Sequence, residues 1–259
     1  YGNKRRITPH LDKFSQDSFV FDTLISNGST TSPAFYALFT SKIPDINGSY
    51  APLPKDKKSL AEILQFNGIT TCGIHSNPHL GTYCNYDRGF GSFFDVYEED
   101  DFLGSGPVAR KLNHAMNKII PKRDSAKFRK LKDKIIKAVK LRTKLLVSPY
   151  ANAEQITGQA INWLQKHHQS SFFLWIHYMD AHVPYYPPRK YLKKVSNKNI
   201  SNEDKFLIYK TDEIVKKTGF SVDDMKKKYK RMTEILYNAE ISYLDHYFGI
   251  LCQYLHEVN

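Results

Sequence analysis

The feature that most constrains the fold is an apolar, strand-like run that leads through a turn of small residues into a helix. Residues 17–25 are mostly apolar and predict a buried strand. A turn of Gly, Ser and Thr follows, and residues 31–42 have helix-compatible content with Pro33 near the first turn. The three hydroxyl side chains at 30–32 are therefore expected where a strand ends and a helix begins.

Two interpretations of these hydroxyls stay open from the residues alone. A helix N-terminus suits an anion, because its unpaired N–H groups and the helix dipole both favour negative charge. A Thr31 hydroxyl held there can attack a phosphorus or sulfur centre when a metal or a base activates it. Ser and Thr are also the usual N-caps of helices, which gives the same residues a purely structural role.

Strand-like and helix-like segments alternate along the rest of the chain. A short helix begins at Thr8-Pro9, and Ser59 caps an amphipathic helix at 59–66, with Leu60, Ile63 and Leu64 on one face. The order strand, helix, strand predicts an α/β fold with a mostly parallel sheet flanked by helices. Further segments are expected in this order: a buried strand at 69–74, a helix at 153–167, a central strand at 171–178, a peripheral segment at 189–222 and a long helix at 223–255.

Composition indicates one large globular domain. The chain has 259 residues, of which 41% are hydrophobic, so its core can be substantial. No apolar run approaches the roughly 20 residues that a membrane-spanning helix needs. Cys72, Cys84 and Cys252 contain no CxxC pair, which argues against a disulfide framework and a zinc knuckle. These scattered cysteines favour a reducing compartment, and we expect a cytoplasmic location.

The net charge of +12 belongs to one segment. Residues 110–144 contain fourteen Lys and Arg against two Asp, a local excess of twelve that equals the net charge of the whole chain. This segment lies in a predicted basic helical insertion at 108–147, whose charged faces are either simply solvated or contact an anionic polymer or surface. Its only aromatic residue is Phe128, which disfavours nucleic acid as the partner.

Three stretches in the same order resemble sulfatases of the alkaline phosphatase superfamily. TPHLDKF at 8–14, the turn, and LFTSKIP at 38–44 resemble the family's TPNLD-type segment, nucleophile-x-Pro-x-Arg turn and LLTGxYP segment. FFLWIHYMDAHVPY at 172–185 is similar to the family's strand that ends in a substrate-contacting His, and YNAEISYLD at 237–245 to the helix that follows. The resemblance implies an alkaline-phosphatase-like sheet in a single sulfatase-like domain over 1–259.

The resemblance also implies site residues. Thr31 takes the position of the nucleophile and of one metal ligand, and His182 that of the His that contacts the oxyanion or the leaving group. Asn77 and His79 lie in a loop similar to the family's GKWHLG segment, so they are expected to contact substrate, although Asn77 replaces a Lys. Asp180 is expected beside His182, either orienting it or capping the turn. His177, within the strand, is interpreted as a core histidine.

Two differences from the family's sequence pattern determine the chemistry that we expect. Thr31 stands where the precursor of formylglycine is Cys or Ser, and Phe35 stands where the pattern has Arg. No formylglycine is therefore expected, and the chain resembles an archaeal-type arylsulfatase-like branch or one that hydrolyses phosphodiesters or phosphonates with an unmodified Thr. The implied activity is metal-dependent hydrolysis of small or polymeric sulfate or phosphate esters.

The expected cofactor is a divalent metal, namely Ca, Mn, Zn or Mg. Hard cations need several oxygen ligands, and the resemblance assigns only Thr31 within the sequence. The other ligands are expected outside residues 1–259, so we expect an internal fragment that is inactive by itself. The alternative is a catalytically inactive sulfatase-fold module that binds anionic polymers or partners through residues 110–144.

Overall fold

The computed structural model describes the following residues: 5–44, 52–96, 150–197, 200, 201, 204 and 227–258. These residues fall into two compact units, and each is described by itself. The unit called here the sheet unit contains the described residues of 10–97, 152–179 and 247–259; the helical unit contains those of 1–9, 98–151 and 180–246. The predicted single domain over 1–259 stays a prediction, and the predicted insertion at 108–147 lies outside the described residues.

A parallel sheet forms the centre of the sheet unit. Its strands are β1 (Thr70–His75), β2 (Ser92–Asp95) and β3 (Phe172–His177), in the order β2-β1-β3. Both pairings are parallel, which confirms the predicted α/β class. The last residues of the three strands, Asp95, His75 and His177, lie in register at the carboxyl edge.

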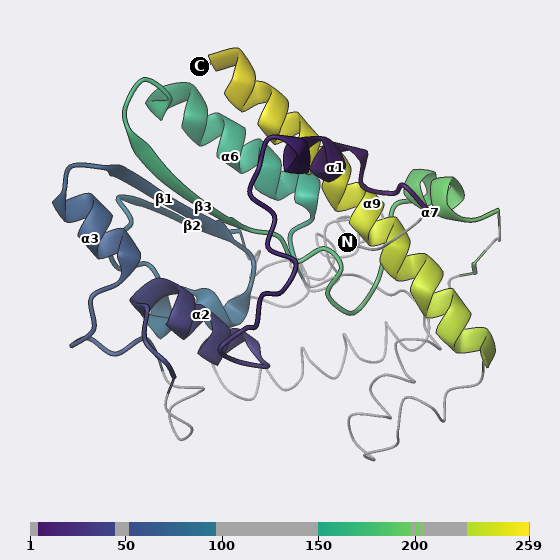
Figure 1. Ribbon diagram of the computed structural model, residues 1–259, viewed down its shortest axis with the longest axis horizontal. Helices are drawn as coiled ribbons and strands as arrows, with labels where there is room; N and C mark the ends of the chain where they lie inside the picture. Colours follow the sequence, from purple (N-terminus) through teal and green to yellow (C-terminus); the bar gives the residue numbers. More distant parts are fainter. Residues whose placement is uncertain are drawn as a thin grey trace, which may run out of the picture. The chain divides into compact units, whose positions relative to one another are not determined.

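Helices cover both faces of this sheet (Figure 1). The helices α2 (Thr31–Thr40) and α3 (Leu60–Phe66) lie on one face, and α6 (Ala153–His167) lies on the other. Ring contacts agree with this arrangement. Phe39 of α2 meets Trp175 edge-on, with ring centroids 5.0 Å apart. On the opposite face of the sheet, Trp163 of α6 meets Phe172, with ring centroids 5.8 Å apart. Alternate residues of β3 therefore serve opposite layers.

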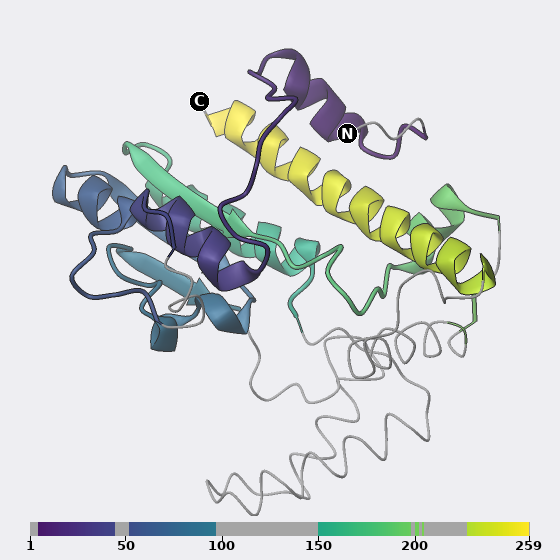
Figure 2. The same ribbon diagram turned by 60° about the horizontal axis from the view of Figure 1, so that its bottom comes forward.

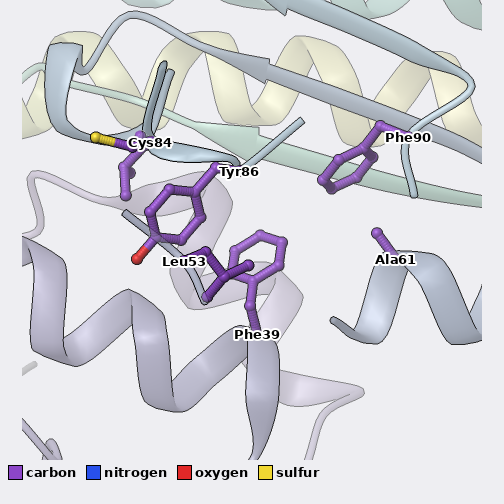
Figure 3. Packing of buried hydrophobic residues seen from close by; sticks show 7 residues of the cluster. Phe39, Leu53, Ala61, Cys84, Tyr86 and Phe90 are labelled. Atoms are coloured by element: carbon purple, nitrogen blue, oxygen red, sulfur yellow. The ribbon is translucent and has the colours of Figure 1, made fainter. Parts of the chain in front are cut away.

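An aromatic core lies between α2, α3 and the sheet (Figure 3). Its centre is Phe39, whose ring contacts those of Tyr86, Phe90 and Trp175. Gly73 of β1 makes room for this core, because a Cβ there would lie 2.8 Å from Phe93 and 3.3 Å from Trp175. The buried members of the cluster are Phe39, Leu53, Ala61, Leu80, Cys84, Tyr86 and Phe90.

Capping residues fix where two helices begin. The Ser59 hydroxyl accepts a hydrogen bond from the Glu62 N–H, while the Glu62 carboxylate accepts one from the Ser59 N–H. Asn152 and Gln155 form the same reciprocal arrangement at the start of α6. The predicted helices at 59–66 and 153–167 are confirmed, including the Ser59 cap.

The strand predicted at 17–25 is wrong. This segment is irregular and exposed, and Phe19 and Ile25 are 98% and 85% accessible. A strand needs ladder hydrogen bonds to a neighbour, and local β propensity does not supply them. Among the described strands none pairs with 17–25, and the chain here instead connects α1 (Pro9–Gln16) to α2.

Two smaller expectations also differ from the structure. β3, predicted to be central, is an edge strand of the described sheet, and β2 was not predicted as a strand. The segment predicted to be mobile or peripheral begins with a helix, α7 (Arg189–Val195). Short apolar runs carry no information about which strand lies beside them, so their order in the sheet is not readable locally.

In the helical unit, α7 packs against the long helix α9 (Lys227–Val258), which continues into the sheet unit. Tyr191 of α7 meets the Tyr243 ring edge-on at 5.0 Å. In the preceding segment the backbone N–H of Tyr186 donates to the buried carboxylate of Glu240, and Tyr185 contacts Tyr237. This segment contains a cis peptide bond between Val183 and Pro184.

At its other end, within the sheet unit, α9 lies beside α1 (Figure 2), where Phe14 meets Phe248 at 5.4 Å. None of the helices in the described ranges has the length and apolar content needed to cross a bilayer.

Candidate functional site

Helix α2 runs antiparallel to β3, and this direction places its first turn. Phe39 contacts Trp175, and Phe35, one turn earlier, contacts His177 with ring centroids 5.0 Å apart. One helical turn advances about 5.4 Å, close to the advance of two strand residues. Thr31, another turn earlier, therefore lies beyond His177, past the carboxyl edge of the sheet. Ligands collect at this edge in open α/β sheets.

Thr31 is the first residue of α2 and is half-buried. The preceding residue, Thr30, has the extended backbone of an N-cap, but its side chain makes no capping hydrogen bond. The first turn of α2 is thus a helix N-terminus without a Thr30 side-chain cap, at the position where an anion is favoured.

Gly28 holds the turn against this helix end. A Cβ at Gly28 would lie 2.7 Å from Pro33 Cβ and 2.8 Å from the Ala34 nitrogen, so only glycine allows the approach. The Ser26 hydroxyl closes the turn by donating to the Gly28 carbonyl at 2.8 Å. The small-residue turn of the sequence therefore serves to position the start of α2.

The loop after β1 carries two predicted substrate contacts. Asn77 is buried, and its Oδ1 accepts the His79 N–H at 2.9 Å, as the cap of a short 3-10 turn at Pro78–Leu80. This turn packs against α2. His79 itself is exposed. Asn77 Oδ1 thus has a structural hydrogen bond, and the substrate roles of Asn77 and His79 stay predictions.

His75, at the end of β1, is fully buried between aromatic rings. Its ring stacks on Trp175 at 5.7 Å and lies 4.9 Å from Phe93. Nδ1 accepts the Asn77 N–H at 3.2 Å, and Nε2 has no hydrogen-bond partner in the structure as described. Burial lowers the pKa of His75 to about 4, so this imidazole is neutral at pH 7.

His182 and Asp180 belong to the helical unit. His182 is exposed, its Nδ1 hydrogen-bonds with the Val183 carbonyl at 2.8 Å, and its ring meets Tyr150 edge-on at 5.6 Å. Asp180 is half-buried. The structure thus groups Thr31 with the Asn77 loop in one unit and Asp180 with His182 in the other. The expected pairing of Thr31 with His182 stays a prediction.

The described residues do not fit a divalent metal by themselves. No group of three or more His, Cys, Asp or Glu in the described ranges is arranged to hold an ion. Thr31 would contribute a single hydroxyl oxygen, whereas Ca²⁺ and Mg²⁺ require about six or more ligands.

Comparison with models of known protein families identifies the family of this chain. The family model described as "Sulfatase" matches residues 1–259. The chain belongs to the sulfatase family. This confirms the resemblance drawn from the three sequence stretches. No match was found among curated proteins.

Among solved structures, the fold of this sulfatase-family chain is similar to a phosphonate monoester hydrolase of Agrobacterium radiobacter. The TM-score is 0.63 at 17% sequence identity, and the match covers 100% of this chain and 56% of that one. The chain thus spans a little over half the length of that hydrolase. At this identity the likeness shows the fold, an alkaline-phosphatase-like sheet flanked by helices.

Proposed function

We propose that this sulfatase-family chain forms part of an enzyme that hydrolyses sulfate or phosphate esters, with the Thr31 hydroxyl as the nucleophile. The observation that carries the proposal is the place of Thr31, on the first turn of α2 beyond the carboxyl edge of the parallel sheet. The backbone N–H groups of this turn favour the negative charge of a bound ester. The hydrolase with a similar fold acts on phosphonate monoesters, which supports these as the substrates to test first.

The proposed reaction has two displacements. Thr31 Oγ forms a bond to phosphorus or sulfur and its proton passes to solvent, while the bond to the leaving oxygen breaks and His182 is proposed to give that oxygen a proton. Water then attacks the same centre and the bond to Thr31 Oγ breaks. The hydroxyl of the water stays on the released acid, its other proton restores the Thr31 hydroxyl, and His182 regains a proton from solvent. The Asn77 loop and Asp180 are proposed to hold the substrate. A divalent metal is expected by family resemblance only.

The test uses a longer polypeptide that contains residues 1–259, because the remaining metal ligands are expected outside them. It measures hydrolysis of three nitrophenyl substrates, namely the sulfate, a phosphodiester and a phosphonate monoester, each with and without added Mn²⁺ or Zn²⁺. We expect Thr31→Ala to lower kcat at least about a thousandfold, because the variant has no attacking oxygen. Thr30→Ala is the matched control, since that hydroxyl makes no capping bond, and its kcat should stay within about twofold of the parent. Turnover that survives Thr31→Ala contradicts the proposal.

A second candidate function rests on charge. The excess of twelve positive charges within 110–144 favours a sulfatase-fold module that binds an anionic polymer without turning it over. Salt-sensitive binding with no hydrolysis of any ester would favour this alternative over the proposed reaction.

A further inference from the structure

We infer that His177 contacts the oxyanion bound at the first turn of α2 and supplies the positive charge that the family pattern places at position 35. The inference rests on the proposed function, since the oxyanion is that of the ester attacked by Thr31. It assigns a substrate-binding role to a residue that the sequence pattern indicates only as part of the core.

The position of His177 follows from its contact with Phe35. Thr31 and Phe35 are four residues apart on α2 and so share one face of the helix. The Phe35 ring meets His177 edge-on, with centroids 5.0 Å apart and planes at 71°. His177 is the last residue of β3 and half-buried. Because α2 runs antiparallel to β3, this end of the strand is the one toward the first turn of α2.

The helix at the site carries no positively charged side chain of its own that could contact the anion. Helix α2 has no acidic or basic side chain anywhere in Thr31–Thr40. The arginine of the nucleophile-x-Pro-x-Arg pattern is replaced by Phe35, whose ring binds no anion. An imidazolium at His177 donates hydrogen bonds and carries a full positive charge, so it can replace the lost cation.

The neighbours of His177 permit this protonation. His75 faces it in register from β1, and burial keeps the pKa of His75 at about 4, so it adds no competing positive charge. Asp95 on β2 lies in the same row, one strand further from His177, and is exposed. Tyr36 is the only titratable residue on α2. Of the two histidines, His75 is neutral at pH 7, and we assign the positive charge beside the bound anion to His177.

The first test uses inorganic phosphate and the whole 259-residue chain. Long-range ¹H–¹⁵N spectra follow each imidazole from pH 5 to 8, and His177→Phe identifies the His177 signal by its loss. We expect phosphate to shift this signal and to raise its pKa by about half a unit or more, which corresponds to about threefold tighter binding by the protonated form. His168, the C-cap residue of α6 across the sheet, is the control and should not respond. No response of His177 at 50 mM phosphate, taken as roughly the weakest binding of interest, overturns the inference.

The second test removes the imidazole at position 177 and places a positive charge at position 35 instead. His177→Phe should weaken phosphate binding at pH 6 about fivefold or more, and Phe35→Arg in that background should restore it without dependence on pH between 6 and 8. Affinities of His177→Phe within about twofold of the parent overturn the inference.

The two proposals fail separately. Thr31-dependent turnover that is unchanged in His177→Phe removes the role of His177 alone. A phosphate-responsive His177 in a chain that hydrolyses no ester keeps the anion site and removes the reaction.

Discussion

At the scale of single residues, His75 links the stability of the fold to pH. Its imidazole is 0% exposed among Trp175 and Phe93, and charging it there would require desolvating a cation. Burial lowers the pKa of His75 from 6.5 to about 4. The unfolded chain therefore binds a proton between these values that the folded chain does not, and stability falls as the pH drops through this window.

We expect the free energy of unfolding to fall by roughly 3 kcal/mol between pH 7 and pH 4 from this residue, since each pKa unit is worth about 1.4 kcal/mol. Urea titrations at pH 7.5, 5.5 and 4.5 measure the change. His75→Phe should remove most of the loss below pH 6.5, whereas His167→Gln, a half-buried histidine on α6, should not. Equal losses in the parent and His75→Phe would show that other groups carry the acid sensitivity.

At the scale of elements, Arg88 anchors the start of α3. Its guanidinium donates to both carboxylate oxygens of Glu62 and to the Pro54 and Lys57 carbonyls, with distances of 2.8 Å to each carbonyl. Burial raises the pKa of Glu62, but the Ser59 N–H and Arg88 outweigh it, so the net direction is down. The capping box of α3 is thus tied to the segment before it.

Loss of this anchor should be costly. We expect Arg88→Ala to lower the free energy of unfolding by about 2–3 kcal/mol, because several charge-assisted hydrogen bonds in a partly buried site are lost together. Arg88→Lys should recover less than half, since an ammonium cannot reproduce the planar fork. Lys166→Ala on α6 is an exposed control that should stay within about 0.5 kcal/mol. Chemical denaturation compares the four proteins, and a value for Arg88→Ala near that control would contradict the anchoring role.

The same anchor explains how much of α3 the sequence can predict. Ser59 and the glycine after the helix define its length, and both signals are local. The orientation is not local: the sequence predicts Leu60 and Ile63 on the buried face, yet these are 41% and 47% exposed while Ala61 is fully buried. The backbone of Ala61 and Glu62 lies against Gly89, and the Glu62 carboxylate forms an ion pair with Arg88. The orientation of α3 therefore depends on contacts between residues 26 positions apart in the sequence, Glu62 and Arg88.

The strand prediction at 17–25 failed for the opposite reason. Its apolar, β-prone residues satisfy every local criterion, but pairing needs an adjacent strand, which local sequence does not reveal. The strands at Thr70–His75 and Phe172–His177 were predictable because neighbours exist for them in the described sheet.

At the scale of the whole molecule, the site was predictable in part. The turn and helix start at Thr31 follow from small residues and Pro33, and the family resemblance carries the rest of its assignment. His177 was not identified, because its relation to Phe35 appears only when α2 lies antiparallel to β3. Two signals were present: His177 ends an apolar strand, and it has the same parity as Trp175, which faces α2.

Charge is the other property of the whole chain. If the segment 110–144 binds a polyanion such as heparin or polyphosphate, affinity should fall about tenfold or more between 50 and 200 mM salt, because counterions are released on binding. A triple variant with Gln at Lys130, Lys134 and Lys137 should flatten this dependence. The same change at Lys190, Lys193 and Lys194 of α7 is the control. An unchanged salt slope in the first variant would assign these lysines to a solvated face.

The absence of a Cβ at Gly73 has a consequence for sequence divergence among relatives. The rings of Phe93 and Trp175 occupy the space that any other residue at 73 would need. A relative with alanine or a larger residue at position 73 is expected to have a smaller side chain at position 93 or 175. Positions 73, 93 and 175 are therefore expected to co-vary in relatives as one set, and a relative that breaks the set should have its helix layer at a different height above the sheet.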